Sequence, residues 1–457
     1  MKKLIAIILI ACAALTLASC GSGIKVERGE KTETEETSRP KATAVQYPYK
    51  KEDSRFEYTI FEDSVTISGI NGDLAEIEIP SEHESKPVTA ISKECDMTGV
   101  SVLKIPESVT VIADEIFNNN ATLRMIVINS PITALPNDFF LGCTALTDVV
   151  LPQTLTEIGL GAFEGCTSLQ MITIPESVSL IGESAFKGCT SLESVSFTPN
   201  MTTVENFCFK GCTALTSVTI PDNIVYIGKS AFEDCTSLSD VAIPETITMV
   251  DQDAFSGTKW IDSFKSEFVI IGDGNLIVYK PTPEIVTVET EAPAETEGAD
   301  GETTSAPAET QAPVTIKKYP SKVTIPNSVK RIMGAFAGHT EISSVYIPDS
   351  VIEISTSAFK GCTDIYSITI PDSVKSIGDS AFEGCTGLSS LTVPTSVEVV
   401  RDRAFANSGL KSIIFGADIS QIGNSVFEGL YDLTVTCPDG SDMMYYCQYN
   451  NIPVVSD

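Results

Sequence analysis

The sequence predicts a repeat solenoid built from coils of about 23 residues, and two periodic signals carry this prediction. Phenylalanine returns at this interval in two runs, with one step of 22 at the end: Phe117, Phe140, Phe163, Phe186, Phe209, Phe232 and Phe255, then Phe336, Phe359, Phe382, Phe405 and Phe427. Cysteine follows three residues after seven of them: Cys143, Cys166, Cys189, Cys212, Cys235, Cys362 and Cys385. A fixed period of this length indicates a solenoid, in which each unit buries its apolar face only against its neighbours.

Within one complete unit, residues 167–189, alternation predicts a short strand. Ile172 and Ile174 point to one face, whereas Thr173 between them points to the other. Pro175 follows at the strand end, where its missing N–H costs least. Equivalent strands of successive units are expected to stack in parallel, about 4.8 Å apart.

The second half of the same unit predicts the opposite edge of the coil. Val178 and Ile181 are expected to point inward, and Gly182 to give the backbone freedom at the next corner. Phe186 then lies on a short helical or 3₁₀ turn and fills the space between successive rungs.

The pattern L-x-x-V-x-I-P-x-S-V-x-x-I-G-x-x-A-F-x-G-C, found over about residues 88–436, resembles the BspA-like (treponemal-type) leucine-rich repeat of bacterial surface lipoproteins. This resemblance implies a curved solenoid with a parallel β-sheet on the concave side. It places short strands and helical or 3₁₀ turns on the convex side. It also implies an exported protein that adheres to host matrix proteins or to other cells, and it supplies no catalytic residue.

The first twenty residues predict export. Lys2 and Lys3 precede an uncharged apolar run, residues 4–18, which is too short to be a spanning helix and is typical of a secretory signal. The following Leu-Ala-Ser-Cys resembles a bacterial lipoprotein cleavage box and predicts lipidation of Cys20, so that the protein contacts the membrane at the cell surface through a lipid anchor only. The alternative is an ordinary signal peptide with an incidental cysteine.

Composition divides the rest of the chain into segments: a flexible stalk (21–55), an N-terminal cap with a degenerate first repeat (56–110), a first repeat block (111–259), a hairpin insert (260–280), an acidic disordered insert (281–315), a second repeat block (316–436) and a C-terminal cap (437–457). Trp260 is expected to cover exposed core beside the hairpin. The acidic insert has five prolines, eight acids and no base, a composition that cannot form a core. It either loops out of one continuous solenoid or acts as a hinge between two, and its Thr and Ser residues are possible acceptors of O-linked sugars.

The regular cysteines allow two interpretations. Export favours disulfides, but equivalent positions in stacked coils lie one rung apart, farther than the roughly 3.8 Å between Cβ atoms that a disulfide requires. We therefore predict free, buried thiols that act as small apolar side chains. His339 occupies the cysteine position of the unit before Cys362, but these two residues are too few ligands for a metal site. Whether Cys437 and Cys447 form a disulfide in the end cap stays open.

Charge and composition exclude several function classes. Sixty-one acidic against 30 basic residues give a net charge of −31, which argues against nucleic acid and anionic lipid as partners. The chain has only two histidines, His83 and His339, and no nucleophile–base arrangement or metal cluster. We therefore predict a protein that is not an enzyme and that carries no cofactor or metal.

The surface left for function is the outward side of the strands, on the concave face. The central outward positions are Val150, Thr173, Ser196, Thr219, Ala242, Tyr346, Thr369, Thr392 and Ile414. Tyr346 and Tyr366 are the candidate ligand anchors, because aromatic side chains dominate interface energetics, and Met171 at a neighbouring outward position is a third candidate. This face predicts binding of protein or glycan ligands, as in an adhesin. One alternative is that Ser and Thr are merely good exposed strand residues and that the contact with a ligand lies on loops or on the disordered insert. Another is that the protein is an envelope scaffold that organises partners of the same cell.

Overall fold

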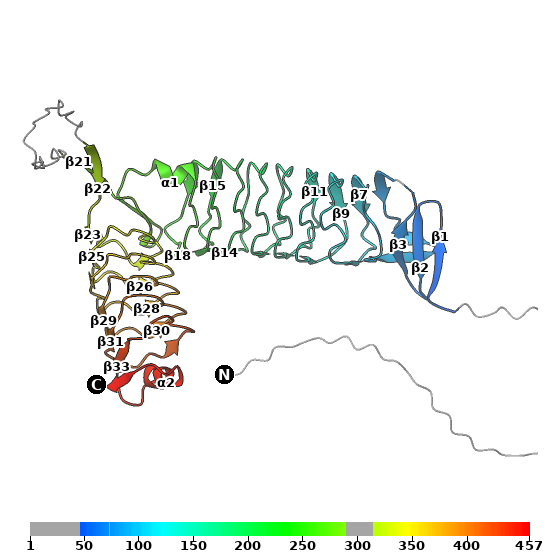
Figure 1. Ribbon diagram of the computed structural model, residues 1–457. Coiled ribbons are helices and arrows are strands. Elements are labelled where there is room, and N and C mark those ends of the chain that lie inside the picture. Colours follow the sequence, from blue (N-terminus) through cyan, green and yellow to red (C-terminus); the bar gives the residue numbers. More distant parts are fainter. Residues whose placement is uncertain (1–45, 73, 289–313) are drawn as a thin grey trace, which may run out of the picture. The chain divides into compact units, whose positions relative to one another are not determined.

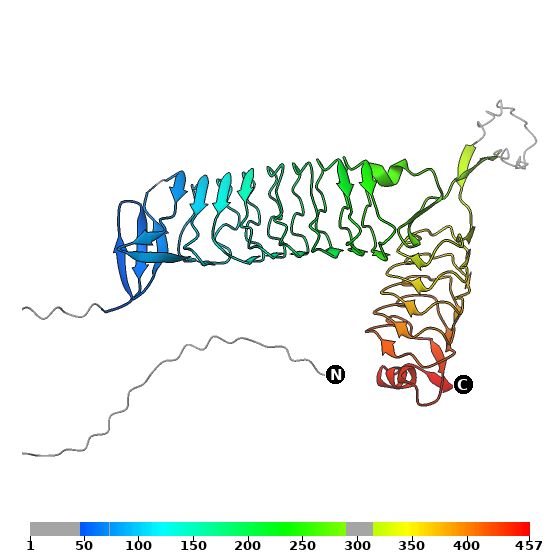
Figure 2. The same cartoon turned by 180° about the vertical axis from the view of Figure 1, so that it is seen from behind.

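The computed structural model describes residues 46–72, 74–288 and 314–457. The predicted signal (1–20) with Cys20, most of the stalk (21–45) and most of the acidic insert (289–313) lie outside these residues. The chain divides into two units, Met1–Gln46 and Tyr47–Asp457, and the description below concerns the second. Its rungs lie side by side within each repeat block (Figures 1 and 2).

Where the first segment of a rung is a strand, it pairs in parallel with its neighbours, and these strands make up the first ladder, which is divided into four separate sheets. These strands are β4 (Glu76–Glu78), β7 (Val102–Ile105), β9 (Met125–Ile128), β11 (Asp148–Val150), β15 (Ser217–Thr219), β17 (Asp240–Ala242), β23 (Lys322–Thr324), β25 (Ser344–Tyr346), β27 (Ser367–Ile368), β29 (Ser390–Val393), β31 (Ser412–Phe415), β33 (Thr434–Cys437) and β34 (Val454–Ser456). Paired residues lie about one repeat apart, as in Ser217 opposite Asp240. The predicted solenoid with parallel strands is confirmed.

A second ladder of two-residue parallel strands runs along the opposite edge of the coil and is likewise divided among four sheets. They are β8 (Val111–Ile112), β10 (Ala134–Leu135), β12 (Glu157–Ile158), β13 (Leu180–Ile181), β14 (Thr203–Val204), β16 (Tyr226–Ile227), β18 (Met249–Val250), β24 (Arg331–Ile332), β26 (Glu353–Ile354), β28 (Ser376–Ile377), β30 (Val399–Val400) and β32 (Gln421–Ile422). The turns that carry the phenylalanines also bond between rungs, since the N–H of Phe186 donates to the carbonyl of Cys208 at 2.8 Å. Backbone groups are thus satisfied at three places around each rung.

The recurring phenylalanines form a stacked column inside the coil. From Phe163 to Phe255, adjacent ring centroids lie 5.1–5.5 Å apart with planes within 10°. From Phe336 to Phe427, the spacing is 5.2–5.9 Å and the planes lie within 16°. The rings are buried, so each coil fills its interior with the side chains of its neighbours, as the period predicts.

The cysteines lie beside this column as free, buried thiols. The Cys189 Sγ donates to the carbonyl of Phe163 at 3.1 Å, and the same contact recurs along the array. Burial raises the pKa of the Cys189 thiol to about 12. Cys437 and Cys447 are free as well, which decides the question left open for the end cap.

Two details of the unit 167–189 differ from expectation. Ile172 and Ile174 are buried, but residues 170–175 form no strand. Burial needs only an extended chain, whereas a ladder also needs aligned N–H and C=O groups. Gly182 is required by close approach of the rungs rather than by a left-handed backbone, because a Cβ there would lie 2.7 Å from the backbone nitrogen of Leu160. The left-handed residue at this corner is Ser184, with φ of 58°.

A short helix and a hairpin separate the two repeat blocks. The helix α1 (Lys259–Ser263) is an element that the sequence analysis did not predict. Its Trp260 covers the core as expected, with its ring 4.9 Å from that of Phe255. The predicted hairpin is confirmed as the antiparallel pair β19 (Phe268–Ile271) and β20 (Asn275–Tyr279).

The hairpin contributes to the cores of both blocks. Val269 and Ile271 of β19 belong to the hydrophobic cluster of the first block. Leu276 and Tyr279 of β20 belong to that of the second block, and β20 pairs in parallel with β24. The hairpin therefore takes the place of a rung in the second ladder.

The ends of the array are closed by other elements. The N-terminal cap consists of β1 (Tyr49–Glu52), β2 (Phe56–Ile60), β3 (Val65–Ile70), β5 (Glu82–His83) and β6 (Lys86–Ile91). Strand β1 lies in the segment predicted as stalk, which corrects the end of that stalk, because its backbone pairs with β2. At the C-terminal end, Ser441 caps α2 (Asp442–Tyr449) by accepting from the N–H of Met444.

The two margins of the predicted disordered insert are also ordered. The strands β21 (Glu284–Val288) and β22 (Val314–Lys318) pair in antiparallel register. The β-branched residues at the margins give these short segments strand propensity, a signal that the composition of the whole insert concealed.

Candidate ligand-binding groove

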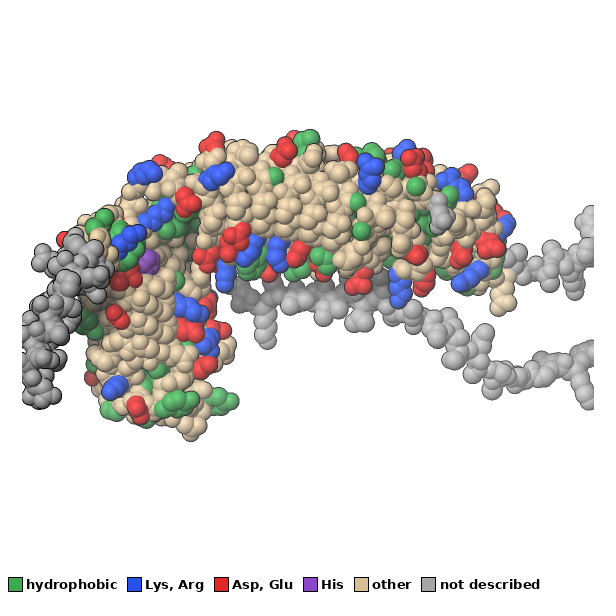
Figure 3. Space-filling view, turned by 45° about the horizontal axis from the view of Figure 1, so that its top comes forward, with side chains coloured by type: hydrophobic (Ala, Val, Ile, Leu, Met, Phe, Trp, Pro, Cys, Tyr) green, Lys and Arg blue, Asp and Glu red, His purple; other side chains and the backbone are tan. Residues whose placement is uncertain are grey.

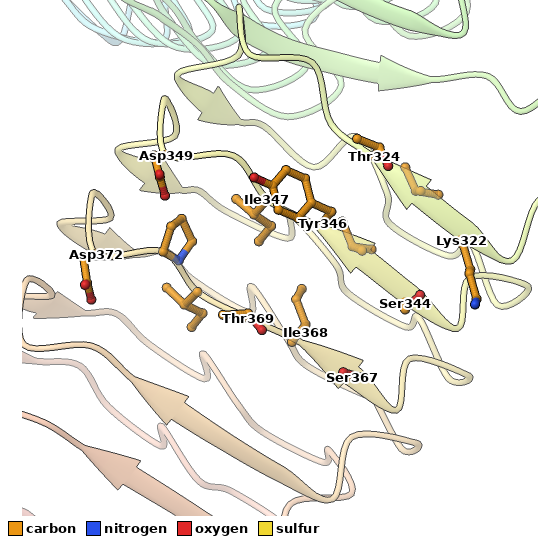
Figure 4. Close-up of a pocket in the computed structure, with 14 residues that line it drawn as sticks. Lys322, Thr324, Ser344, Tyr346, Ile347, Asp349, Ser367, Ile368, Thr369 and Asp372 are labelled. Atoms are coloured by element: carbon orange, nitrogen blue, oxygen red, sulfur yellow. The ribbon is translucent and has the colours of Figure 1, made fainter.

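A shallow groove runs over the outward face of the first ladder in the second repeat block. It joins two depressions of about 600 and 750 Å³. They share Ser367, Ile368, Thr369, Ile370 and Asp372. The groove extends over the rungs of β23, β25, β27, β29 and β31, and Figure 4 shows the part nearest β23.

The floor of the groove is lined by hydroxyl groups in regular positions. One serine per rung stands at the same position of four successive rungs: Ser344, Ser367, Ser390 and Ser412. Beside this serine column are Thr324, Tyr346, Thr369, Thr392 and Ile414, again one residue per rung. The rigid stack beneath them fixes the spacing between successive hydroxyls.

These hydroxyls differ from those at the corners of the coil. Corner hydroxyls are satisfied by the previous rung; for example, Ser373 Oγ donates to the carbonyl of Val351 at 2.6 Å. Within the described part of the chain, the hydroxyls of the serine column and of Thr369 have no side-chain hydrogen bond. All but Ser344 in the column are exposed. Each is therefore free to donate to and accept from a ligand.

Both predicted tyrosine anchors lie at this groove. Tyr346 lines the first depression and Tyr366 the second, and each is 61% exposed. Their rungs are adjacent, but the N–H of Tyr366 donates to the carbonyl of Ser343, three residues before Tyr346. Three residues along the strand and one rung across put the two Cα atoms about 11 Å apart. The rings therefore mark a diagonal across the groove, and their contact with a ligand remains a prediction.

Charges lie at the rim of the groove. Asp349 and Asp372 follow the prolines that end two neighbouring strands, and they stand at one side of Tyr346 (Figure 4). Lys322 stands at the opposite side, at the start of β23. None of these three residues was among the candidates predicted from the sequence. The recurring I-P-D motif could have identified the two carboxylates, because it places an acid at the sheet edge on successive rungs.

The third candidate, Met171, lies outside the groove. It is 68% exposed on a rung of the first block, whereas both tyrosines belong to rungs of the second block. The structure thus brings the two tyrosines to one groove and leaves Met171 elsewhere. Cys20 lies outside the described residues.

Perturbed carboxylates occur away from this groove. Glu383 lies in an ion-pair ladder between rungs, 2.9 Å from Lys360 Nζ and 2.8 Å from a guanidinium nitrogen of Arg403. Burial would raise the pKa of Glu383, but the hydrogen bonds from Arg403 and Lys360 outweigh it and lower that pKa to about 2. This network joins neighbouring rungs, so it serves stability rather than proton transfer.

Among residues 46–72, 74–288 and 314–457, no group of three or more His, Cys, Asp or Glu side chains is arranged to hold a metal ion. In these same ranges no helix has the length and apolar character to cross a bilayer. On the face shown in Figure 3, acidic and basic side chains follow the margins of the first block and leave a broad band without charge.

Comparisons with known proteins place the repeats in a family. The family described as "BspA type Leucine rich repeat region (6 copies)" matches residues 71–184, 156–273 and 317–434. No curated protein matches the chain.

Solved structures of bacterial leucine-rich repeat proteins are similar to this chain. A protein from Bacteroides ovatus is 26% identical, with 90% of this chain and 100% of that chain covered and a TM-score of 0.48. A leucine rich cell surface protein from Faecalibacterium prausnitzii is 26% identical over 90% of this chain and 99% of that chain, with a TM-score of 0.43. The T. pallidum leucine rich repeat protein is 24% identical over 45% and 90%, with a TM-score of 0.31. Because the family match covers well over half of the sequence, the chain belongs to the BspA type leucine rich repeat family.

Proposed function

We propose that this protein is a lipid-anchored, cell-surface binding protein that holds its ligand in the groove of the second repeat block. The observation that carries the proposal is the alignment of unpartnered hydroxyls with two half-exposed tyrosines on a rigid stack of rungs. Ordered side chains lose little conformational entropy on binding, which favours recognition by such a surface. The protein acts by binding and carries out no catalysis.

Export and anchoring rest on the sequence of residues 1–20. The apolar run and the Leu-Ala-Ser-Cys box support processing at Cys20 and lipidation there. The test is palmitate labelling of the producing cell with wild type and Cys20→Ser. Label and membrane retention are expected for wild type alone, and equal labelling of both proteins would rule out the anchor.

The ligand is sought with the lipid-free chain immobilised on a sensor surface. Host matrix proteins, glycans and the envelope extract of the producing cell are passed over it in turn. Tyr346→Ala combined with Tyr366→Ala is expected to lower ligand binding, whereas Tyr431→Ala, which removes an aromatic ring that is 93% exposed outside the groove, leaves it unchanged. Undiminished binding by the double variant would exclude the groove.

The same experiment separates an adhesin from an envelope scaffold. Signal with matrix proteins or foreign glycans supports adhesion. Signal restricted to the producing cell's own extract would replace adhesion with the scaffold function, in which the array organises partners of the same envelope.

A further inference from the structure

We infer that the ligand of this groove is an uncharged, extended polysaccharide of β-1,4-linked sugars that crosses successive rungs. The inference rests on the proposed function, namely that the groove binds a ligand, and it names the class of that ligand. Four features of the groove carry it: the closed backbone of strand β25, the repeat of its hydroxyls, the position of its charges and the exposed faces of its tyrosines.

The backbone of the strand that carries Tyr346 offers no edge to a peptide. Strand β25 is paired on one side with β23 and on the other with β27. Peptides recognised by sheets commonly add as a further strand, through main-chain hydrogen bonds at an open edge. A ligand lying over this face meets side chains only, so recognition depends on hydroxyls and aromatic rings.

The hydroxyls repeat at the interval that a sugar chain requires. Ser344, Ser367, Ser390 and Ser412 occupy one position on four successive rungs, and neighbouring rungs lie about 4.8 Å apart. This interval is close to the length of one residue in an extended β-1,4-linked polysaccharide. Each rung can therefore meet one sugar, and because successive β-1,4-linked sugars are turned about the chain axis, the serine column meets alternating hydroxyl-bearing edges of the chain.

The charges of the groove select an uncharged chain. Its floor carries no ionised side chain, while Asp349 and Asp372 stand at one side of the rim and Lys322 alone at the other. These carboxylates accept hydrogen bonds from sugar hydroxyls but repel carboxylate or sulfate groups on a ligand. The net charge of −31 adds to this repulsion of polyanions.

The two tyrosines fit the apolar faces of sugar rings. Each ring is 61% exposed, so its face is available for stacking against the C–H groups of a pyranose. Most of their separation of about 11 Å lies along the strands, so the rings stand on opposite sides of a chain that crosses the rungs and are offset by one rung along it. One sugar chain can therefore meet both rings, and a longer chain adds contacts with further serines of the column.

The first block supplies a comparison within the same chain. At the positions of the serine column it carries Asp148, Met171, Ser194, Ser217 and Asp240, and at the central positions Val150 and Ala242 flank Thr173, Ser196 and Thr219. Its run of serines is therefore two rungs long, against four in the second block. We therefore place the sugar chain on the second block alone.

The test measures binding of neutral β-1,4-linked glucose, xylose and mannose oligomers of two to six sugars to the full chain by titration calorimetry. For the sugar type that binds, affinity is expected to rise by about tenfold or more from two to six units. Tyr346→Ala and Tyr366→Ala are each expected to weaken hexamer binding by about two- to tenfold, from the 0.5–1.5 kcal/mol of an aromatic contact. Ser367→Ala is expected to weaken it by a similar factor, through loss of one hydrogen bond.

Controls separate this inference from the proposed function. Tyr431→Ala is expected to leave hexamer binding unchanged, and circular dichroism checks the fold of each variant. If no neutral hexamer binds but a protein ligand binds in a way that depends on Tyr346 and Tyr366, the ligand is not a polysaccharide, and the groove remains the proposed binding site. Tighter binding of a polyanionic chain such as hyaluronan would also overturn the inference. If neither tyrosine affects any ligand, both the inference and the proposed function fail.

Discussion

Replacing Phe186 by alanine tests the column of stacked rings on which the solenoid depends. Phe186 is buried and lies between two rings, with centroids 5.1 Å away at Phe163 and 5.5 Å away at Phe209. Phe→Ala in a core costs about 3–5 kcal/mol, and each stacked neighbour contributes about 0.5–1.5 kcal/mol beyond area burial. Because Phe186→Ala removes two stacked contacts, we expect a loss in the upper part of that range, about 4–5 kcal/mol.

The position along the column sets a graded expectation. Phe427, at the C-terminal end of the column, stacks on Phe405 at 5.9 Å and meets Phe415 and Tyr446 edge-on at 6.3 and 6.2 Å. Because these rings lie farther away than those around Phe186 and Phe427 is slightly exposed, Phe427→Ala is expected to cost about 3 kcal/mol, roughly 1 kcal/mol less than Phe186→Ala.

Urea unfolding provides the measurement for Phe186→Ala. Trp260 is the sole tryptophan and packs against the hydrophobic cluster that includes Phe186, so its fluorescence reports the first block. A repeat array need not unfold in one step, and the transition is therefore followed by fluorescence and by circular dichroism together. Thr173→Ala, on the exposed side of the same coil, serves as control and is expected to change stability by less than about 0.5 kcal/mol. A loss below about 1 kcal/mol for Phe186→Ala would refute the reasoning that buried rings hold the rungs together.

Three further predictions concern the contacts between rungs. Because the pKa of Glu383 is lowered to about 2, its stabilising effect is present above the ordinary carboxyl range near 4.5 and is lost as the pH falls toward 2. Because partial exposure of Arg403 screens the ion pair, we expect Glu383 to contribute about 2 kcal/mol to the free energy of unfolding. Acid titration followed by circular dichroism should show that the fall in stability with decreasing pH is reduced in Glu383→Gln but kept in Glu428→Gln. An equal pH dependence of stability in both variants would contradict this prediction. Gly182→Ala should lower the unfolding midpoint in urea, because its Cβ would lie 2.7 Å from the backbone of the previous rung, and an unchanged midpoint would show that the rungs can separate at no cost. Cys189, with a pKa raised to about 12, should resist iodoacetamide at pH 8 in the folded protein and react in urea, as mass spectrometry of the labelled peptide measures; rapid labelling without urea would contradict its burial.

Repetition made most of the fold predictable from the amino-acid order. One unit of 23 residues predicts its own strand, corner and turn. Because the same pattern recurs in the other units, a weak signal in one unit is supported by clearer signals in its neighbours. The burial of Phe186, the free thiol of Cys189 and the hairpin of residues 268–279 were all expected from such local signals. The helix at Lys259–Ser263 was not expected, because its five residues are too few to show a helical periodicity in the sequence.

The candidate site was predictable only in part. Alternation along each strand identified Tyr346 and Tyr366 as outward residues, since a period of two assigns every side chain to a face. That they line one groove, while Met171 does not, depends on which rungs are neighbours and on the space between them. Asp349 and Asp372 also line this groove because of the way neighbouring rungs pack.

Periodicity therefore determined what each coil buries, because every unit meets a copy of itself and the same side chains must fill the same space. The depth of the groove, the unpartnered state of its hydroxyls and the place of the charges at its rim required the packed coordinates. Each of these properties depends on distances between residues of different rungs. Such distances follow from the stacking of the whole array and from no single stretch of sequence.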